Sequence, residues 1–282
     1  MSALTNFFIR IIPQHGLSNL VYKLTRIRSP WFKDWSIKWF IKQFNVDMSL
    51  AMQPEPEAYK DFNSFFTRPL RHDVRPICNK GVACPVDGTI SQIGPIVDNT
   101  LVQAKDHSYD LTALLGGSAA LAKHFRNGHF CTIYLSPRDY HRIHMPHDGN
   151  LREMTYVPGK LYSVNTYTAE TVPGLFAINE RILNIFETNN GPMAVIQVGA
   201  INVGSMETVW HGMVTPPYGK EITTWRYDKE TIELQRGDEM GRFNMGSTVI
   251  LLFAKDAIQW QENLKAADTV RMGQCLSEVK PV

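Results

Sequence analysis

The stretch Arg242-Phe243-Asn244-Met245-Gly246-Ser247-Thr248-Val249-Ile250-Leu251-Leu252-Phe253 (RFNMGSTVILLF) places Gly-Ser-Thr directly before the most apolar run of the chain. Residues 249–253 are all β-branched or large and apolar, which is typical of a buried strand. A turn that leads into such a strand explains the order of residues. A peptide bond positioned for cleavage explains it as well, so the stretch raises both a structural and a chemical question.

Length and composition permit a substantial core. The chain has 282 residues, of which 44% are hydrophobic, and this size suits one large domain or two small ones. The formal net charge is +2 and the isoelectric point is near 8.3. So mild a surplus does not indicate binding to nucleic acid, and we expect no nucleic-acid partner.

Most of the chain after residue 66 is predicted to be strand. Glycine and proline separate short β-branched or aromatic runs, namely 132–135, 194–198, 208–210 and 249–253. Residues 111–125 and 257–267 are the best helix candidates within this part. We therefore predict an α+β fold with a β-rich catalytic domain of mostly antiparallel strands over residues 67–282. An N-terminal set of short amphipathic helices, residues 1–66, would associate with a membrane.

The N-terminal segment is basic and aromatic. Residues 1–48 contain seven Lys or Arg against two acidic residues, a net charge of +5, and Trp31, Trp35 and Trp39 recur at spacing four. Pro13 and Pro30 divide the segment into short helices. Aromatic rings with a basic opposite face suit the headgroup region of a bilayer. An amphipathic helix packed on the protein's own core would show the same pattern.

Neither a secretory signal nor a membrane-spanning run is recognisable. The first residues lack a signal peptide's cleavage pattern, and no run reaches the ~18–20 apolar residues needed to span a bilayer. Cys78, Cys84, Cys131 and Cys275 are scattered without a CxxC pair. Free thiols in a reducing compartment explain them, so we expect a cytoplasmic protein that can still lie on a membrane surface.

Histidines are concentrated between residues 134 and 147. His141, His144 and His147 follow one another at spacing three beside Asp139 and two arginines. Imidazole transfers protons near neutral pH, and a neighbouring carboxylate can fix its tautomer. Zinc is an alternative, but Pro146 disfavours one helix through all three rings, and we expect no metal. Asp87, in an Asp-Gly pair, is a turn residue by pattern alone.

Ser247 admits two chemistries. A hydrolase nucleophile commonly lies in a GxSxG strand-to-helix elbow, which is absent here, although a Ser/His/Asp hydrolase needs no fixed spacing. Ser247 can instead attack the carbonyl of Gly246, because glycine neither shields that carbonyl nor resists strain. Elimination across Ser247, hydration and loss of ammonia would leave a pyruvoyl group.

The chain resembles the bacterial phosphatidylserine decarboxylases. The resemblance covers nearly the whole length and rests on motifs in the expected order: FFTRPL (65–70), PVDG (85–88), residues 134–146, PGKLYSVN (158–165), FAINER (176–181), Val198-Gly199-Ala200 with Val203-Gly204, and Gly246-Ser247-Thr248. One departure is Met245, where the family usually has leucine. Leu and Met have similar volume and apolarity, so we expect processing to survive.

The resemblance implies a self-processing proenzyme. Cleavage between Gly246 and Ser247 would give a β chain, residues 1–246, and an α chain, residues 247–282, whose first residue becomes the pyruvoyl cofactor. The self-cleavage triad maps onto Asp87, His144 and Ser247. The two chains would form a heterodimer, and a dimer of such heterodimers is a further assembly that the resemblance allows.

The implied reaction converts phosphatidylserine to phosphatidylethanolamine and CO₂. The substrate amine would form a Schiff base with the pyruvoyl carbonyl, the electron sink for decarboxylation. His144 would return the proton and His141 would bind the substrate carboxylate or phosphate. A membrane substrate favours membrane contact through Trp31, Trp35 and Trp39, hence a peripheral enzyme on the cytoplasmic side of the cell membrane. A Ser/His/Asp esterase or protease and a non-catalytic membrane-binding module are the alternatives.

Overall fold

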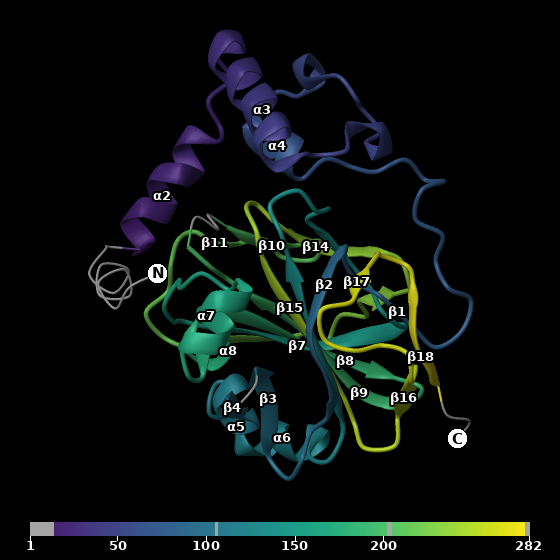
Figure 1. Ribbon diagram of the computed structural model, residues 1–282. Helices are drawn as coiled ribbons and strands as arrows, with labels where there is room; N and C mark the ends of the chain where they lie inside the picture. Colours follow the sequence, from purple (N-terminus) through teal and green to yellow (C-terminus); the bar gives the residue numbers. More distant parts are fainter. Residues whose placement is uncertain (1–13, 105–106, 202–204, 280–282) are drawn as a thin grey trace.

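The computed structural model describes residues 14–104, 107–201 and 205–279 (Figure 1). Pro13 and the pair Val203-Gly204, which the sequence analysis used, lie outside these residues. Within them the protein is rich in antiparallel strands, with short helices at its N-terminal end, as the sequence predicted.

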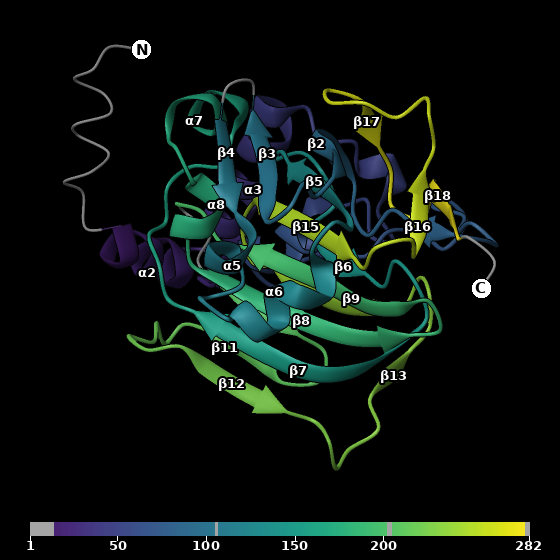
Figure 2. The ribbon, with the colours of Figure 1, turned by 90° about the horizontal axis from the view of Figure 1, so that it is seen from below.

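A nine-stranded antiparallel sheet forms the centre of the body. Its strands are ordered β12-β7-β8-β9-β15-β5-β2-β17, and β13 also pairs with β7 (Figure 2). Their bounds are β2 (Gly88–Pro95), β5 (His129–Leu135), β7 (Gly149–Val157), β8 (Arg181–Thr188), β9 (Gly191–Val198), β12 (Thr223–Arg226), β13 (Glu233–Leu234), β15 (Ser247–Phe253) and β17 (Thr269–Val270).

Three smaller sheets surround it. A four-stranded sheet has the order β11-β10-β14-β6, a three-stranded one β1-β18-β16, and a hairpin joins β3 to β4. Their bounds are β1 (Val82–Ala83), β3 (Thr100–Ala104), β4 (His107–Asp110), β6 (Arg142–His144), β10 (Met206–Thr208), β11 (Gly212–Thr215), β14 (Glu239–Phe243), β16 (Ile258–Trp260) and β18 (Cys275–Val279).

Strand β15 is the central strand that the apolar run predicted. It pairs with β5 on one side and β9 on the other, and residues 249–253 are buried. A strand covered on both faces needs apolar side chains at every position, which explains the unbroken run. The runs at 132–135 and 194–198 lie in β5 and β9, as expected.

The chain changes sheets immediately before β15. Strand β14 belongs to the four-stranded sheet and β15 to the large one, so residues 244–246 make the crossing. Asn244 fixes it: its Nδ2 donates to the Ser205 hydroxyl over 2.7 Å, and its Oδ1 accepts from Asn63 over 2.9 Å. Gly246-Ser247 therefore joins two sheets at a firmly held position.

The N-terminal helices lie together at one end of the body (Figure 1). They are α2 (Gln14–Leu24), α3 (Pro30–Phe44), the 3₁₀ turns η1 (Met48–Leu50) and η2 (Pro56–Ala58), and α4 (Phe62–Phe66). Pro30 begins α3, which confirms the predicted break. Ile37 and Phe40 of α3 are buried against α4, whose start is fixed by a capping box between Asp61 and Ser64.

The helix prediction for residues 111–125 is only partly right. The structure has two helices, α5 (Leu111–Leu114) and α6 (Ala119–Phe125), separated by Gly116 and Gly117 at φ values of 69° and 88°. Such values end a right-handed helix. Two further short helices, α7 (Thr166–Thr171) and α8 (Leu175–Ile178), lie beside the large sheet.

Two other predictions are wrong. Residues 257–267 form no helix, because Ile258–Trp260 is strand β16 and pairs with β18, and this pairing outweighs helix propensity. The predicted strand at 208–210 ends at Thr208, and the chain then turns into β11 through Val209 and Trp210.

Candidate active site

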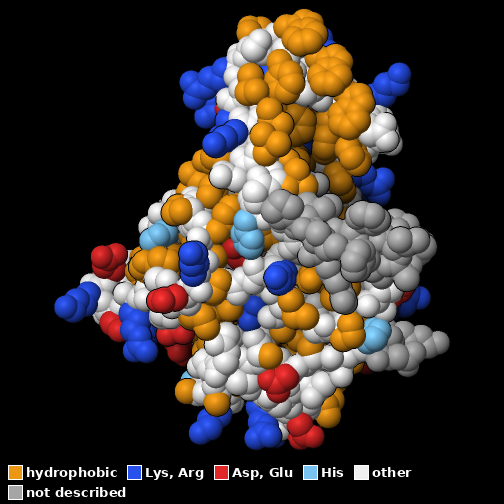
Figure 3. Space-filling view, turned by 90° about the vertical axis from the view of Figure 1, so that its left-hand side faces the viewer, with side chains coloured by type: hydrophobic (Ala, Val, Ile, Leu, Met, Phe, Trp, Pro, Cys, Tyr) orange, Lys and Arg blue, Asp and Glu red, His pale blue; other side chains and the backbone are white. Residues whose placement is uncertain are grey.

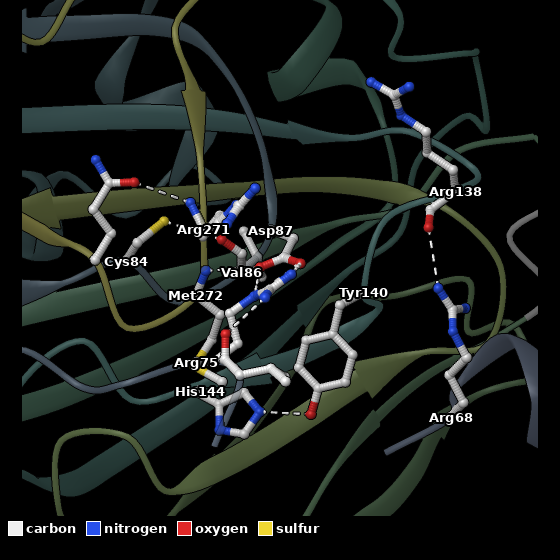
Figure 4. Close-up of polar contacts among 12 residues, drawn as sticks. Arg68, Arg75, Cys84, Val86, Asp87, Arg138, Tyr140, His144, Arg271 and Met272 are labelled. Carbon is white, nitrogen blue, oxygen red and sulfur yellow. Dashed lines mark hydrogen bonds and ion pairs between the residues drawn. The ribbon is translucent and has the colours of Figure 1, made fainter. Parts of the chain in front are cut away.

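His144 is held by hydrogen bonds at both ring nitrogens, and Figure 4 shows the one to Tyr140. Its Nδ1 lies 2.7 Å from the Gly237 carbonyl oxygen, and its Nε2 lies 2.9 Å from the Tyr140 hydroxyl. A carbonyl only accepts, so Nδ1 carries the proton and Nε2 accepts from Tyr140. Burial lowers the pKa of His144, although the Gly237 carbonyl and Glu239 oppose the shift. His144 is thus a neutral imidazole whose Nε2 is the basic atom.

Asp87 is buried in an ion pair with Arg75 (Figure 4). The Arg75 Nε lies 2.9 and 3.2 Å from the two carboxylate oxygens, and the Met272 amide donates to Oδ1 over 2.8 Å. This hydrogen bonding with Asp87 raises the pKa of Arg75. In the described part of the chain, Asp87 makes no hydrogen bond to His144.

The two residues are nevertheless neighbours. The His144 amide donates to the Pro85 carbonyl over 2.9 Å, two residues before Asp87. The charge of Asp87 makes a small contribution that raises the pKa of His144. Because the Nδ1 proton of His144 goes to Gly237 rather than to a carboxylate, the His–Asp hydrogen bond of a hydrolase relay is not formed between these two described residues.

His141 has a different environment. It is fully buried, and its ring stacks on Phe66 with the centroids 4.1 Å apart. Neither ring nitrogen makes a well-aligned hydrogen bond among the described residues. Burial, followed by the positive charge of Arg68, lowers the pKa of His141 to about 3, and the nearby Ser136 and Pro137 carbonyls oppose this shift. His141 is therefore uncharged at neutral pH.

The Gly246 position lies next to His141. A Cβ atom built on Gly246 would be 3.9 Å from the Cε1 atom of His141 and 3.9 Å from the Leu135 carbonyl oxygen, so it would fit in ordinary van der Waals contact with both. The backbone of Ser247 pairs with Leu135, whereas its side chain is outside the described structure. The structure thus brings His141 to the predicted cleavage site.

Met245 has a strained backbone. Its φ is 149°, a value that residues with a side chain rarely adopt. Such conformations cost about 1–3 kcal/mol and cluster at functional sites. The strain lies directly before the Gly246-Ser247 peptide bond.

Two apolar cavities meet at Met245. One, of about 260 Å³, is lined by Gly246, Phe66, Leu135 and neighbouring residues. The other, of about 370 Å³, is lined by Leu24, Phe32, Trp35, Trp39 and Phe62 among others. Phe40, Phe44 and Met245 line both. These three side chains therefore stand between the cavity along α3 and the cavity at Gly246.

A third cavity, of about 250 Å³, is polar. Asp87 and Tyr140 line it together with Arg68, Arg75 and Arg138. Arg68 is buried and donates to the Arg138 carbonyl over 3.1 Å, while its Nε and Nη1 have no partner among the described residues (Figure 4). Burial lowers the pKa of Arg68. This cavity is therefore lined by arginine cations beside Asp87 and Tyr140.

The three tryptophans of α3 point away from the core. Trp31, Trp35 and Trp39 are 77%, 57% and 52% exposed. Leu20, Leu24 and Ile27 extend this apolar surface, and Figure 3 shows it crowded with hydrophobic side chains and flanked by Lys and Arg. Among the described residues no helix is both long and apolar enough to cross a membrane.

Sequence reasoning missed several contributors. Tyr140, Arg75 and Phe66 received no role, yet they contact His144, Asp87 and His141. Tyr140 stands four residues before His144 within the histidine block, which was the available signal. No group of His, Cys, Asp and Glu in the described ranges has the arrangement of a metal site.

Comparison with known proteins decides the family. The family model for phosphatidylserine decarboxylase matches residues 62–278. The chain belongs to the phosphatidylserine decarboxylase family. A second model, described as PSD, matches residues 7–45. The expected membership of this enzyme family is thereby confirmed.

Curated relatives within the phosphatidylserine decarboxylase family align along almost the whole chain. The phosphatidylserine decarboxylase proenzyme of Shewanella frigidimarina (strain NCIMB 400) is 52% identical over 276 residues, covering 96% of each chain. The proenzyme of Shewanella baltica (strain OS155) is 53% identical over 278 residues, covering 96% of this chain and 95% of the relative. That of Idiomarina loihiensis is 50% identical over 279 residues, covering 97% and 96%.

Proposed function

We propose that the chain cleaves itself between Gly246 and Ser247 and then decarboxylates phosphatidylserine to phosphatidylethanolamine and CO₂. Family membership supports the reaction, since the relatives are named phosphatidylserine decarboxylase proenzymes. The observation that carries the proposal is the pair of apolar cavities that meet at Met245. They lie between the exposed tryptophan surface and the peptide bond that would become the reactive terminus, and Phe40, Phe44 and Met245 line both.

Self-cleavage begins with attack of the Ser247 hydroxyl on the Gly246 carbonyl, which converts the peptide into an ester. His144 is the base, because its neutral Nε2 can take the hydroxyl proton. Tyr140 occupies that nitrogen in the intact chain, so this hydrogen bond must be exchanged for one from Ser247. Release of strain at Met245 favours the attack.

Asp87 is the third member of the proposed triad and acts on His144 through its charge, without a hydrogen bond between them. Its charge favours a protonated His144, and Arg75 with the Met272 amide holds it in place. Elimination then breaks the Cβ–O bond of Ser247: the Cα loses its proton and Gly246 leaves as a carboxylate. Addition of water and loss of ammonia give pyruvoyl at the new terminus of the α chain.

The residues around Gly246 suit such a group, because a Cβ there meets only ordinary van der Waals contacts and the position borders an apolar cavity. A pyruvoyl group at this place would supply a carbonyl for the substrate amine and an electron sink for the loss of CO₂. His141 holds the substrate carboxylate through a neutral N–H donor, since its lowered pKa excludes a cation. His144 returns a proton to the α-carbon, and its lowered pKa makes the imidazolium a ready donor.

Membrane contact supplies the lipid. We infer that the surface of Trp31, Trp35 and Trp39 lies in the headgroup region, with the surrounding cations facing anionic lipid. An acyl chain would then enter the apolar cavity along α3. The protein would be a peripheral enzyme on the cytoplasmic side of the cell membrane, with residues 1–66 as its membrane-associating part.

Intact mass spectrometry of the wild type and of Ser247→Ala tests the processing. We expect two wild-type fragments that meet at Gly246 and Ser247. The smaller fragment should be lighter than the unmodified sequence 247–282 by the mass of one ammonia. The Ser247→Ala chain should stay whole. A single wild-type chain that a fluorophosphonate probe labels at Ser247 would instead indicate a serine hydrolase.

Two further experiments address the residues. A processed preparation carrying His144→Ala should lose most phosphatidylethanolamine formation, and full turnover would exclude His144 as the proton donor. Replacement of Trp31, Trp35 and Trp39 by serine should reduce flotation with phosphatidylserine-containing vesicles. Flotation equal to that of the wild type would show that these side chains do not bind the membrane.

A further inference from the structure

Two thiols meet at one backbone carbonyl, far along the chain from each other. The Sγ of Cys78 donates to the Lys80 carbonyl oxygen over 3.1 Å, and the Sγ of Cys275 donates to the same oxygen over 3.3 Å. The two sulfur atoms are therefore no farther apart than the sum of these distances. Both cysteines are partly exposed, so solutes can reach them.

The surrounding backbone holds the two cysteines together. The Cys78 amide donates to the Gly273 carbonyl over 2.9 Å, and Cys275 in β18 pairs with Ala83 in β1. Burial, followed by the neighbouring Cys275, raises the pKa of Cys78 to about 11. A disulfide would require the two side chains to rotate until the sulfurs lie about 2.0 Å apart.

The pair straddles the proposed cleavage site. Cys78 belongs to residues 1–246 and Cys275 to residues 247–282. We propose that Cys78 and Cys275 are an oxidation site at which a peroxide forms a disulfide that joins the α and β chains covalently. Only if the proposed self-cleavage occurs does the disulfide join two chains. The disulfide itself can also form in an uncleaved chain.

The oxidant is of the hydroperoxide class, and the reaction balances with it. With hydrogen peroxide, the thiolate of one cysteine of the pair attacks a peroxide oxygen, the O–O bond breaks, and after proton transfer a sulfenic acid and one water form. The other cysteine then attacks the sulfenic sulfur, the S–S bond forms, and a second water leaves. The two thiols lose two electrons and two protons, which the peroxide takes up.

The other two cysteines provide an internal contrast. Cys84 and Cys131 are fully buried, and burial raises the pKa of both thiols. Cys84 donates to the Val86 carbonyl over 3.0 Å and lies within the core of the large sheet. Neither should react with peroxide while the protein is folded.

The consequence would be retention of the α chain. Without a covalent link, a processed enzyme holds its 36 C-terminal residues, 247–282, only by strand pairing and packing. A disulfide at β18 would keep the fragment attached through transient opening. It would lie outside the cavities around Gly246 and Asp87, so turnover should not change.

The test treats purified wild-type enzyme with hydrogen peroxide and compares denaturing gels with and without reductant. We expect the α and β chains to migrate as one band without reductant and as two with it. The crosslinked species should be lighter than the sum of the reduced chains by two hydrogen atoms. Cys78→Ser and Cys275→Ser, which keep a donor for the Lys80 carbonyl, should each abolish the link, whereas Cys84→Ala should form it.

The uncleaved Ser247→Ala chain separates this proposal from the proposed processing. Its peptide map after peroxide should contain a reducible crosslink between the Cys78 and Cys275 peptides. If wild type stays uncleaved but this crosslink forms, the self-cleavage proposal fails and the oxidation site stands. If peroxide gives no such crosslink in either protein, or an equal yield in Cys78→Ser, the oxidation site is wrong.

Discussion

Met245 is the residue whose backbone departs most from what its side chain allows near the reactive peptide. Replacement of Met245 by glycine should stabilise the precursor, because glycine has no Cβ to oppose a φ of 149°. Strain of about 1–3 kcal/mol that is released on attack would speed self-cleavage by roughly tenfold to a hundredfold.

We therefore predict that Met245→Gly slows self-cleavage by about tenfold or more, in keeping with that strain. Met245→Ala is the matched control, since it also removes the side chain from the cavities but retains Cβ and the strain. Pulse-chase of the precursor measures both rates, and equal rates for Gly and Ala would show that the strain plays no part. Met245→Leu, which restores the residue usual in the family, should process like the wild type.

His144 should set the acid limb of self-cleavage. The reaction needs the neutral imidazole, and burial lowers the pKa of His144, so the neutral form persists below the ordinary value of 6.5. The rate should be level above neutral pH and fall only at a pH lower than 6.5. Precursor made in a cell-free extract and moved into buffers of different pH gives this profile.

Tyr140→Phe should move that limb to higher pH. The Tyr140 hydroxyl donates to the Nε2 lone pair and so favours the neutral ring; its loss raises the pKa of His144. The plateau should be at least as high as in wild type, because no hydrogen bond has to be exchanged before Ser247 can donate. An unchanged acid limb would mean that another group controls the profile.

At the scale of elements, helix α3 has one buried face and one exposed face. Ile37 and Phe40 are buried against α4, whereas Trp31, Trp35 and Trp39 face outward. Phe40→Ala should reduce the free energy of unfolding by about 3–5 kcal/mol, as is usual for a buried phenylalanine. The triple tryptophan-to-serine variant should change it much less, since exposed side chains contribute little to folding.

Urea unfolding in detergent-free buffer measures the free energy of unfolding of both variants. A large loss of stability in the tryptophan variant would mean that these side chains pack within the protein, and would weaken the proposal of membrane contact. Comparable stability of the Phe40→Ala variant and the wild type would contradict the burial of α3 against α4.

The sequence predicted elements well where a local pattern determines them. The apolar run at 249–253 predicted a buried strand, and Pro30 predicted the start of a helix, because those properties act within a few residues. The helix prediction for residues 257–267 was wrong, because Ile258–Trp260 takes its conformation from pairing with β18. A local sequence pattern does not contain this pairing. The glycines at 116–117 were a local signal that should have divided the predicted helix.

The sequence predicted which residues belong to the candidate site, but not which of their side chains are in contact. The family motifs selected Asp87, His144 and Ser247, yet which side chain meets which depends on residues far apart in sequence. Arg75 pairs with Asp87, and the Gly237 carbonyl, 93 positions after His144, fixes the tautomer of that ring. Such partners follow from the topology of the sheets, which a motif does not specify.

For the whole molecule, the position of the proposed cleavage has a mechanical consequence. The α chain would begin with β15, which lies between β5 and β9 in the middle of the large sheet. Burial of each large side chain in residues 249–253 contributes about 1.5–3 kcal/mol. Strands β17 and β18 add further pairing with β2 and β1.

Cleavage should therefore leave one folded body. We predict that under reducing conditions the α and β chains elute together in native buffer, and that native mass spectrometry gives the mass of both chains combined. They should separate only when urea unfolds the sheet, because removal of β15 would expose the core on both of its faces. Recovery of folded, soluble β chain without the α chain in native buffer would contradict this, since residues 1–246 would then have to close the sheet between β5 and β9 without β15.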